Sequence, residues 1–96
     1  MKISLTKRAE KKYRLIKEYI RTEWGVRVES AFEQRAKDFF DLLKDFPKQG
    51  PLEIEEKQIR GIMLTKHTKI FYRIKGNRII ILTFFDVRQD PSKKFK

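Results

Sequence analysis

Three closely spaced segments near the end of the chain have the apolar pattern of β-strands. They cover residues 59–65, 68–74 and 78–85, and short polar turns separate them. In the second segment Ile70, Tyr72 and Ile74 point one way and the intervening residues the other. The third segment is apolar on both sides over residues 79–82. It is therefore predicted to be central in an antiparallel sheet that helices cover on one side.

The first half of the chain begins with a short alternating segment and a helix. Residues 1–5 alternate polar and apolar side chains, which predicts a short edge strand. Thr6 follows as a plausible N-cap. One helical face then carries apolar residues at spacings of three and four: Ala9, Tyr13, Ile16 and Ile20, with Leu15 and Tyr19 widening the stripe. Gly25 fits the C-cap that ends this helix.

A second amphipathic helix follows almost without a connection. Its apolar positions again repeat at threes and fours: Val28, Phe32, Ala36, Phe39, Leu43 and Phe46. Glu29 and Glu33 are among the residues expected on the solvent side, and Pro47 ends the helix. Two helices joined this tightly are predicted to pack as an antiparallel hairpin. Residues 48–58, with a turn at Gly50-Pro51, form the only linker-like segment.

The fold class predicted from these elements is α+β. A short N-terminal strand precedes an antiparallel helical hairpin, and three antiparallel strands complete one mostly antiparallel sheet. With 96 residues, the chain is expected to be a single domain over 1–96. It has no cysteine, no secretory apolar segment and no apolar run of membrane-spanning length. We expect a soluble cytoplasmic protein with no metal, no cofactor and no membrane contact.

The net charge of +11 is unevenly distributed. Residues 1–24 carry eight Lys or Arg against three acids, residues 25–50 five of each sign, and residues 51–96 eleven against five. The chain is basic at both ends and neutral in the middle, so its electric field is polarised. This distribution favours an anionic binding partner over charges that serve only solubility.

The order of elements resembles the RelE/ParE superfamily of bacterial toxins, the plasmid-stabilisation type. The resemblance covers essentially the whole chain and is carried by residues 5–10, 46–47, 50–51, 59–60, 66–68, 70–74, 80–82 and 85–91. Its most specific part is Asp-Val-Arg-Gln-Asp-Pro at 86–91, after an isoleucine-rich strand. The resemblance implies the toxin of a type II toxin–antitoxin pair, which inhibits growth until a cognate antitoxin neutralises it.

Two branches of this superfamily share the fold and differ in their target. RelE-like members cleave mRNA on the ribosome, and ParE-like members poison DNA gyrase. Cleavage by a 2′-hydroxyl needs a base, an acid, and cations for the charge on the phosphorane. Lys69 and Arg88 match the family's cation positions, and Arg60 is the only basic residue of the strand before them.

The acid and base of a nuclease are harder to place. His67 has an ordinary pKa near neutrality, but its predicted turn makes an exposed or capping role the simpler interpretation. Asp86 could act as a base or pair with a strand cation. Cations that could contact the target or its phosphates lie at the last hairpin and in the tail: Arg73, Arg78, Lys93 and Lys94. Because no acid and base are found in the places that a nuclease needs, the residues favour the gyrase-directed branch. Whether the protein is an enzyme stays open.

The partner predictions do not depend on that choice. An acidic, partly disordered antitoxin segment fits the positive charge, and the target is DNA gyrase or the ribosome with its mRNA. A homodimer or a toxin–antitoxin hetero-oligomer are both possible assemblies. The alternative functions are a ribosome-dependent mRNA endoribonuclease and a non-toxic basic module that binds nucleic acid.

Overall fold

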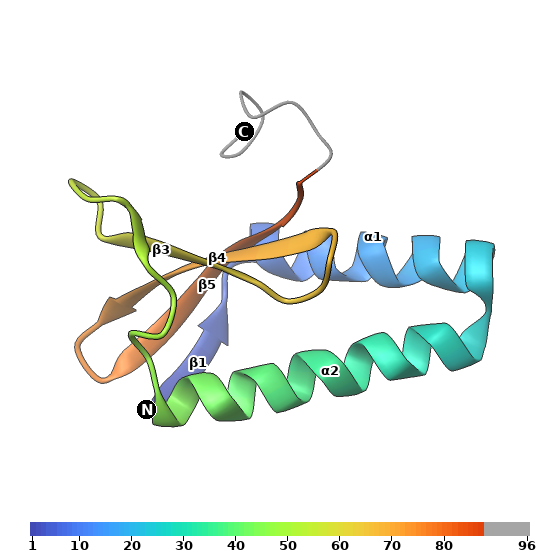
Figure 1. Ribbon diagram of the computed structural model, residues 1–96, viewed down its shortest axis with the longest axis horizontal. Coiled ribbons are helices and arrows are strands. Elements are labelled where there is room, and N and C mark those ends of the chain that lie inside the picture. Colours follow the sequence, from blue (N-terminus) through green and yellow to red (C-terminus); the bar gives the residue numbers. More distant parts are fainter. Residues whose placement is uncertain (88–96) are drawn as a thin grey trace.

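The computed structural model describes residues 1–87. In chain order the elements are β1 (Lys2–Leu5), α1 (Lys7–Trp24), α2 (Val26–Asp45), β2 (Leu52–Ile54), β3 (Ile59–Met63), β4 (Thr68–Lys75) and β5 (Arg78–Asp86). The predicted α+β fold is confirmed, with a short first strand, a helical hairpin and a C-terminal run of antiparallel strands (Figure 1).

The strands form one mixed sheet in the order β1-β5-β4-β3-β2. β1 runs parallel to β5 at the edge, and the other neighbours are antiparallel. β5 lies inside the sheet between β1 and β4, as predicted for this central strand, and β4 has the middle position of the five. Both strands have neighbours on each side, because the short β1 pairs with the outer edge of β5. β5 is apolar on both faces because it contributes to both apolar clusters: Ile79, Ile81 and Phe84 join the helix-facing core, and Leu82 and Phe85 join the cluster on the other face.

The segment predicted as a linker contains a fifth strand. Leu52–Ile54 forms β2 and pairs with the start of β3, with an irregular register. Three residues are too few for an alternating pattern to be recognised. Pairing with β3 provides hydrogen-bond partners for the backbone groups of β2, which would bond to water in an unpaired linker.

The helical hairpin is built as predicted. The Thr6 hydroxyl accepts a hydrogen bond from the Ala9 amide at 3.0 Å and donates to the Leu82 carbonyl at 2.9 Å, which ties the start of α1 to β5. Gly25 alone connects the helices, with φ at +92°, a conformation that glycine adopts without strain. Figure 1 shows the two helices antiparallel and extending well beyond the sheet.

One face of the sheet packs on the helices, and the other has a smaller apolar cluster of its own. The core between helices and sheet contains Ala9, Phe32, Ala36, Leu43, Leu64, Ile70, Tyr72, Ile79, Ile81 and Phe84. On the opposite face Ile59, Phe71 and Phe85 are buried together. A register shift between β4 and β5 beside Phe71 places both Ile81 and Phe84 toward the helices.

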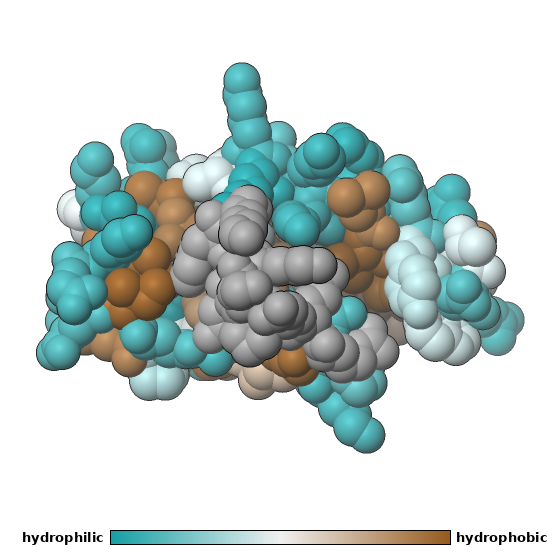
Figure 2. Space-filling model, turned by 90° about the horizontal axis from the view of Figure 1, so that it is seen from above, coloured by the Kyte–Doolittle hydropathy of each residue, from teal (hydrophilic) through white to brown (hydrophobic). Residues whose placement is uncertain are grey.

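Four predicted stripe positions lie at the surface instead of in the core: Leu15, Tyr19, Val28 and Phe46 are all exposed. Tyr19 and Val28 belong to the parts of α1 and α2 nearest the Gly25 connection, and this end of the hairpin extends beyond the sheet (Figure 1), so only the partner helix is available to cover them. Phe46 is the C-cap of α2 and has non-helical backbone angles, so its side chain leaves the stripe. Over the face seen in Figure 2, hydrophilic side chains predominate, with separate apolar patches between them.

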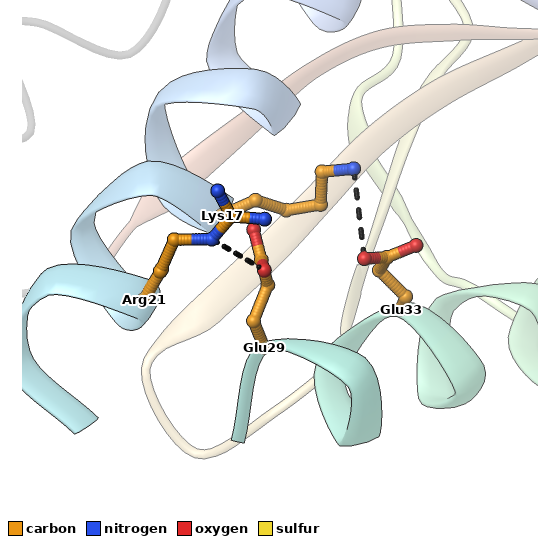
Figure 3. Close-up of polar contacts among 4 residues, drawn as sticks. All are labelled: Lys17, Arg21, Glu29 and Glu33. Atoms are coloured by element: carbon orange, nitrogen blue, oxygen red, sulfur yellow. Dashed lines mark hydrogen bonds and ion pairs between the residues drawn. The ribbon is translucent and has the colours of Figure 1, made fainter. Parts of the chain in front are cut away.

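Glu29 is buried, although the helical period predicted it on the solvent side. Its carboxylate accepts a hydrogen bond from Arg21 Nε at 2.9 Å, and its side chain is 8% exposed against 64% for Arg21. Figure 3 shows this pair, together with a second one from Lys17 to Glu33, joining α1 to α2. The close approach of the two helices shields Glu29, and the arginine compensates its charge.

A partly buried tyrosine, Tyr13, and a fully buried one, Tyr72, make stability sensitive to alkaline pH. Burial raises the pKa of Tyr13 and Tyr72 above the ordinary value; Glu33 and Glu29 raise the pKa of Tyr13 further, whereas Gly50 and Arg60 partly offset the rise for Tyr72. The folded chain then keeps protons that the unfolded chain loses. The stabilisation is complete below about pH 10 and is lost as pH rises through the folded-state pKa values.

We therefore expect the free energy of unfolding to fall above about pH 10. Urea unfolding of the parent chain and of Tyr13→Phe, followed from about pH 8 to 11, measures this dependence. The variant should show a shallower decline. If the free energy of unfolding falls equally steeply with pH in both proteins, Tyr13 does not contribute to the pH dependence.

Candidate functional site

The face of the sheet turned away from the helices, called the open face below, carries several predicted site residues. On β4, Lys69, Phe71 and Arg73 alternate with residues of the helix-facing core. Across the sheet, Lys69 pairs with Met63 of β3 and Phe85 of β5. Residues paired across neighbouring strands share a face, so the register assigns each predicted cation to one side.

Lys69 is held in an ion pair that crosses the sheet. Its Nζ contacts the Glu53 carboxylate of β2, passing over β3, and lies 5.3 Å from the centre of the Phe71 ring. The Lys69 and Glu53 side chains are only 21% and 22% exposed. Partial burial strengthens such a pair relative to one in open water, so Lys69 is fixed in position and its charge is compensated within the chain.

Gly61 of β3 makes room for this ion pair. A Cβ at this position would overlap the Glu53 carboxylate and lie 2.8 Å from Lys69 Cε. Glycine weakens a strand interior, and it often marks a place where another group approaches the backbone closely. Here the approaching group is the Glu53–Lys69 pair.

We expect Gly61→Ala to destabilise the parent chain and to be nearly neutral when Glu53→Ala is also present. In the double variant the space occupied by the carboxylate is free, and alanine no longer carries the backbone entropy cost of glycine. A double-mutant cycle by urea unfolding should give a coupling of about 1 kcal/mol between positions 53 and 61. Additive effects would contradict the steric link.

Arg60 lies on the other face of the sheet from Lys69. It pairs with Tyr72, whose side chain belongs to the helix-facing core. Its Nη1 donates to the carbonyl oxygens of Gly50 at 2.8 Å and Lys48 at 3.4 Å. Arg60 therefore holds the loop that follows α2 and does not join Lys69 in one site.

His67 and Asp86 lie near each other at one end of the sheet. His67 is exposed in the turn between β3 and β4, and its carbonyl accepts from the Val87 amide at 3.0 Å. Asp86 pairs with Thr68, next to the Phe85–Lys69 pair, so it belongs to the face opposite Lys69. A backbone hydrogen bond thus ties the turn to the end of β5, while Asp86 and Lys69 occupy opposite faces of the sheet.

The remaining candidates divide between the described residues and the tail. Arg73 and Arg78 are exposed at the opposite end of the open face, beside the β4–β5 turn. Arg88, Lys93 and Lys94 lie outside the described residues. Over residues 1–87 no group of three side chains could hold a metal ion. No helix in that range is long and apolar enough to cross a membrane.

The sequence pattern missed two residues of this site, Glu53 and Gly61. Glu53 falls in the segment 48–58 that is predicted as a linker, because the three-residue β2 gives no periodic signal. The available signal was the glycine in an otherwise apolar strand, which indicates close approach of another group. Only the pairing of β2 with β3 shows which group it is.

Comparison with known proteins assigns the fold to a family. A family model described as the ParE toxin of the type II toxin–antitoxin system parDE matches residues 3–91. Among solved structures, a chromosomal ParDE system from P. aeruginosa superposes with a TM-score of 0.74 at 21% identity, over 90% of this chain and 95% of that one. A YoeB/ParE toxin from Agrobacterium tumefaciens gives 0.65 at 17% identity, over 90% and 98%. None of the curated protein sequences matches this chain.

Proposed function

This chain belongs to the ParE toxin family of type II toxin–antitoxin systems, and on that premise we propose that it arrests growth by acting on DNA gyrase. A toxin of such a system is paired with an antitoxin. The proposal further assigns it an acidic antitoxin, because a net charge of +11 on 96 residues favours an anionic partner. Its action would take place in the cytoplasm, where gyrase acts on the chromosome.

The observation that carries the gyrase proposal is the separation of Arg60 from Lys69. A nuclease needs cations gathered around one scissile phosphate, and Arg60 and Lys69 are predicted cations on adjacent described strands. Here Arg60 faces the helices and donates to the loop at Lys48 and Gly50, whereas Lys69 is on the open face and is paired with Glu53. Recruiting both to one phosphate would require breaking two intramolecular interactions on opposite sides of a sheet.

Pulse labelling after induction tests the proposal. Incorporation of labelled thymidine and methionine is followed side by side in bacteria during the first minutes of expression. We expect thymidine incorporation to fall first. A prompt fall in methionine incorporation with thymidine spared would instead assign the chain to the mRNA-cleaving branch.

A purified system gives a second, independent readout. The chain is added to gyrase and relaxed plasmid with ATP, and supercoiling and linear cleavage products are measured on a gel. Inhibition or trapped cleavage that is reversed by co-purified antitoxin supports gyrase as the target. If growth is unaffected and gyrase is uninhibited while folded protein accumulates, the non-toxic nucleic-acid-binding alternative becomes the better account.

A further inference from the structure

Four cationic side chains lie together on the open face, at the end far from Lys69. Arg78 of β5 pairs with Lys2 of β1 on one side and with Lys75 of β4 on the other. Arg73 lies two residues before Lys75 on the same face of β4. Three neighbouring strands therefore present Lys2, Arg78 and Lys75 in a row, with Arg73 beside it. We call these four residues the basic strip.

The face assignment of the strip follows from its neighbours. Ile3, Ile74 and Ile79, each adjacent in sequence to a strip residue, pack against the helix-facing core. Alternation along each strand directs the strip residues to the other side. All four are exposed.

Within residues 1–87, no carboxylate forms an ion pair with a residue of the strip. The ion pairs found within 1–87 join other residues: Lys17 to Glu33, Arg21 to Glu29, Lys44 to Asp41 and Lys69 to Glu53. The strands that carry the strip contain no acid except Asp86, which is at the other end of β5. The cations of the strip thus stand beside one another and not beside carboxylates.

This arrangement is unfavourable for the isolated fold. Strands are about 4.8 Å apart, and like charges directly opposite each other on neighbouring strands destabilise a sheet. Here Arg78 has a cation opposite it on both sides. A bound polyanion would turn this repulsion into attraction.

We propose that the basic strip binds the phosphate backbone of a nucleic acid. Two arginines offer planar donor forks that fit phosphate oxygens, and the two lysines add point charges beside them. An interface with an acidic protein would place apolar side chains at its centre. The large apolar residues that are exposed lie mostly on the helices. None of them belongs to β1, β4 or β5, although Met1 and Val87 stand just outside β1 and β5.

The strip reads no base sequence, because contacts to phosphate position a nucleic acid without specifying it. Its place in the fold separates it from the Glu53–Lys69 pair. The inference goes beyond the proposed function, since it concerns direct contact with nucleic acid and holds for either target.

The test is equilibrium binding of the purified full chain to fluorescein-labelled mixed-sequence duplex DNA and single-stranded RNA. Fluorescence anisotropy is measured at several NaCl concentrations for the parent, for Arg73→Ala/Arg78→Ala, and for a control, Arg27→Ala/Lys37→Ala. The control removes two exposed cations from α2 and has the same net charge as the strip variant.

We expect the strip variant to bind about tenfold or more weakly, and its plot of log K against log salt to be shallower by about 1.5 to 2. The control should change affinity by less than about twofold. Equal losses in both variants, or none in the strip variant, would overturn the proposal. The proposal would also be overturned if the strip variant kept its binding to nucleic acid but lost binding to a polyglutamate peptide. That result would indicate that the strip binds an acidic protein.

Thermal unfolding by circular dichroism accompanies the binding curves. Relief of like-charge repulsion should leave the Tm of the strip variant unchanged or raise it. Weak binding in a variant with an intact melting transition therefore reports on contact and not on misfolding. Because neither gyrase nor ribosomes are present, failure of this assay is separate from failure of the pulse-labelling experiment.

Discussion

Tyr72→Ala is expected to lower the free energy of unfolding by about 3–5 kcal/mol, and Tyr72→Phe by about 1–3 kcal/mol. The Tyr72 ring is completely buried in the core between helices and sheet. Its hydroxyl donates to the Pro47 carbonyl at 2.8 Å and accepts from the Gly50 amide at 3.0 Å. Alanine removes both the ring and these bonds, whereas phenylalanine removes the bonds alone.

The loss of the hydroxyl matters because it leaves a buried amide without its partner. Gly50 is itself enclosed: a Cβ there would lie 2.9 Å from the Tyr72 hydroxyl and 3.0 Å from the Gly61 carbonyl. Urea unfolding monitored by circular dichroism measures both variants. A Tyr72→Phe variant within about 0.5 kcal/mol of the parent would show that water replaces the hydroxyl at Gly50.

Phe71→Ala is expected to cost about 3–5 kcal/mol as well, although its side chain points away from the helices. Phe71 has no exposed surface, and its ring centre lies 6.1 Å from that of Phe85 in an edge-to-face arrangement. Ile59 completes this small cluster, and Lys69 Nζ lies over the Phe71 ring. The substitution would therefore remove packing and weaken the placement of the Glu53–Lys69 pair.

A matched variant separates these two effects. Phe71→Leu keeps most of the apolar volume and removes the aromatic face beneath Lys69, so it should cost less than about 1.5 kcal/mol. Both variants are compared by urea unfolding. If Phe71→Ala is no more destabilising than Phe71→Leu, the cluster on the open face adds little to the stability of the fold.

The two faces of the sheet thus have different tasks. The helix-facing side supplies the main core and holds Arg60 and Tyr72 against the loop after α2. The open face carries a small apolar cluster, one compensated lysine and the basic strip. A proposed nucleic-acid contact on the open face leaves the main core undisturbed, so the strip can be varied without unfolding the protein.

The local pattern of the sequence determined the elements of this protein. Thr6, the helical stripes of α1 and α2, Gly25 and the alternation in β4 were sufficient to predict the hairpin, its antiparallel packing and the C-terminal strands. The elements depend on backbone period and capping, which neighbouring residues set among themselves. The charge distribution likewise followed directly from the residues.

Only the tertiary structure decided which side chains share a face. The parallel pairing of β1 with β5 made β4 the middle strand and brought Lys2 beside Arg78. The pairing of β2 placed Glu53 on Lys69, and the register of β3 moved Arg60 to the opposite side. Close helix packing buried Glu29, whereas the hairpin's extension past the sheet left Tyr19 exposed. Each outcome depends on pairing between segments far apart in the chain, which the period of a single segment does not encode.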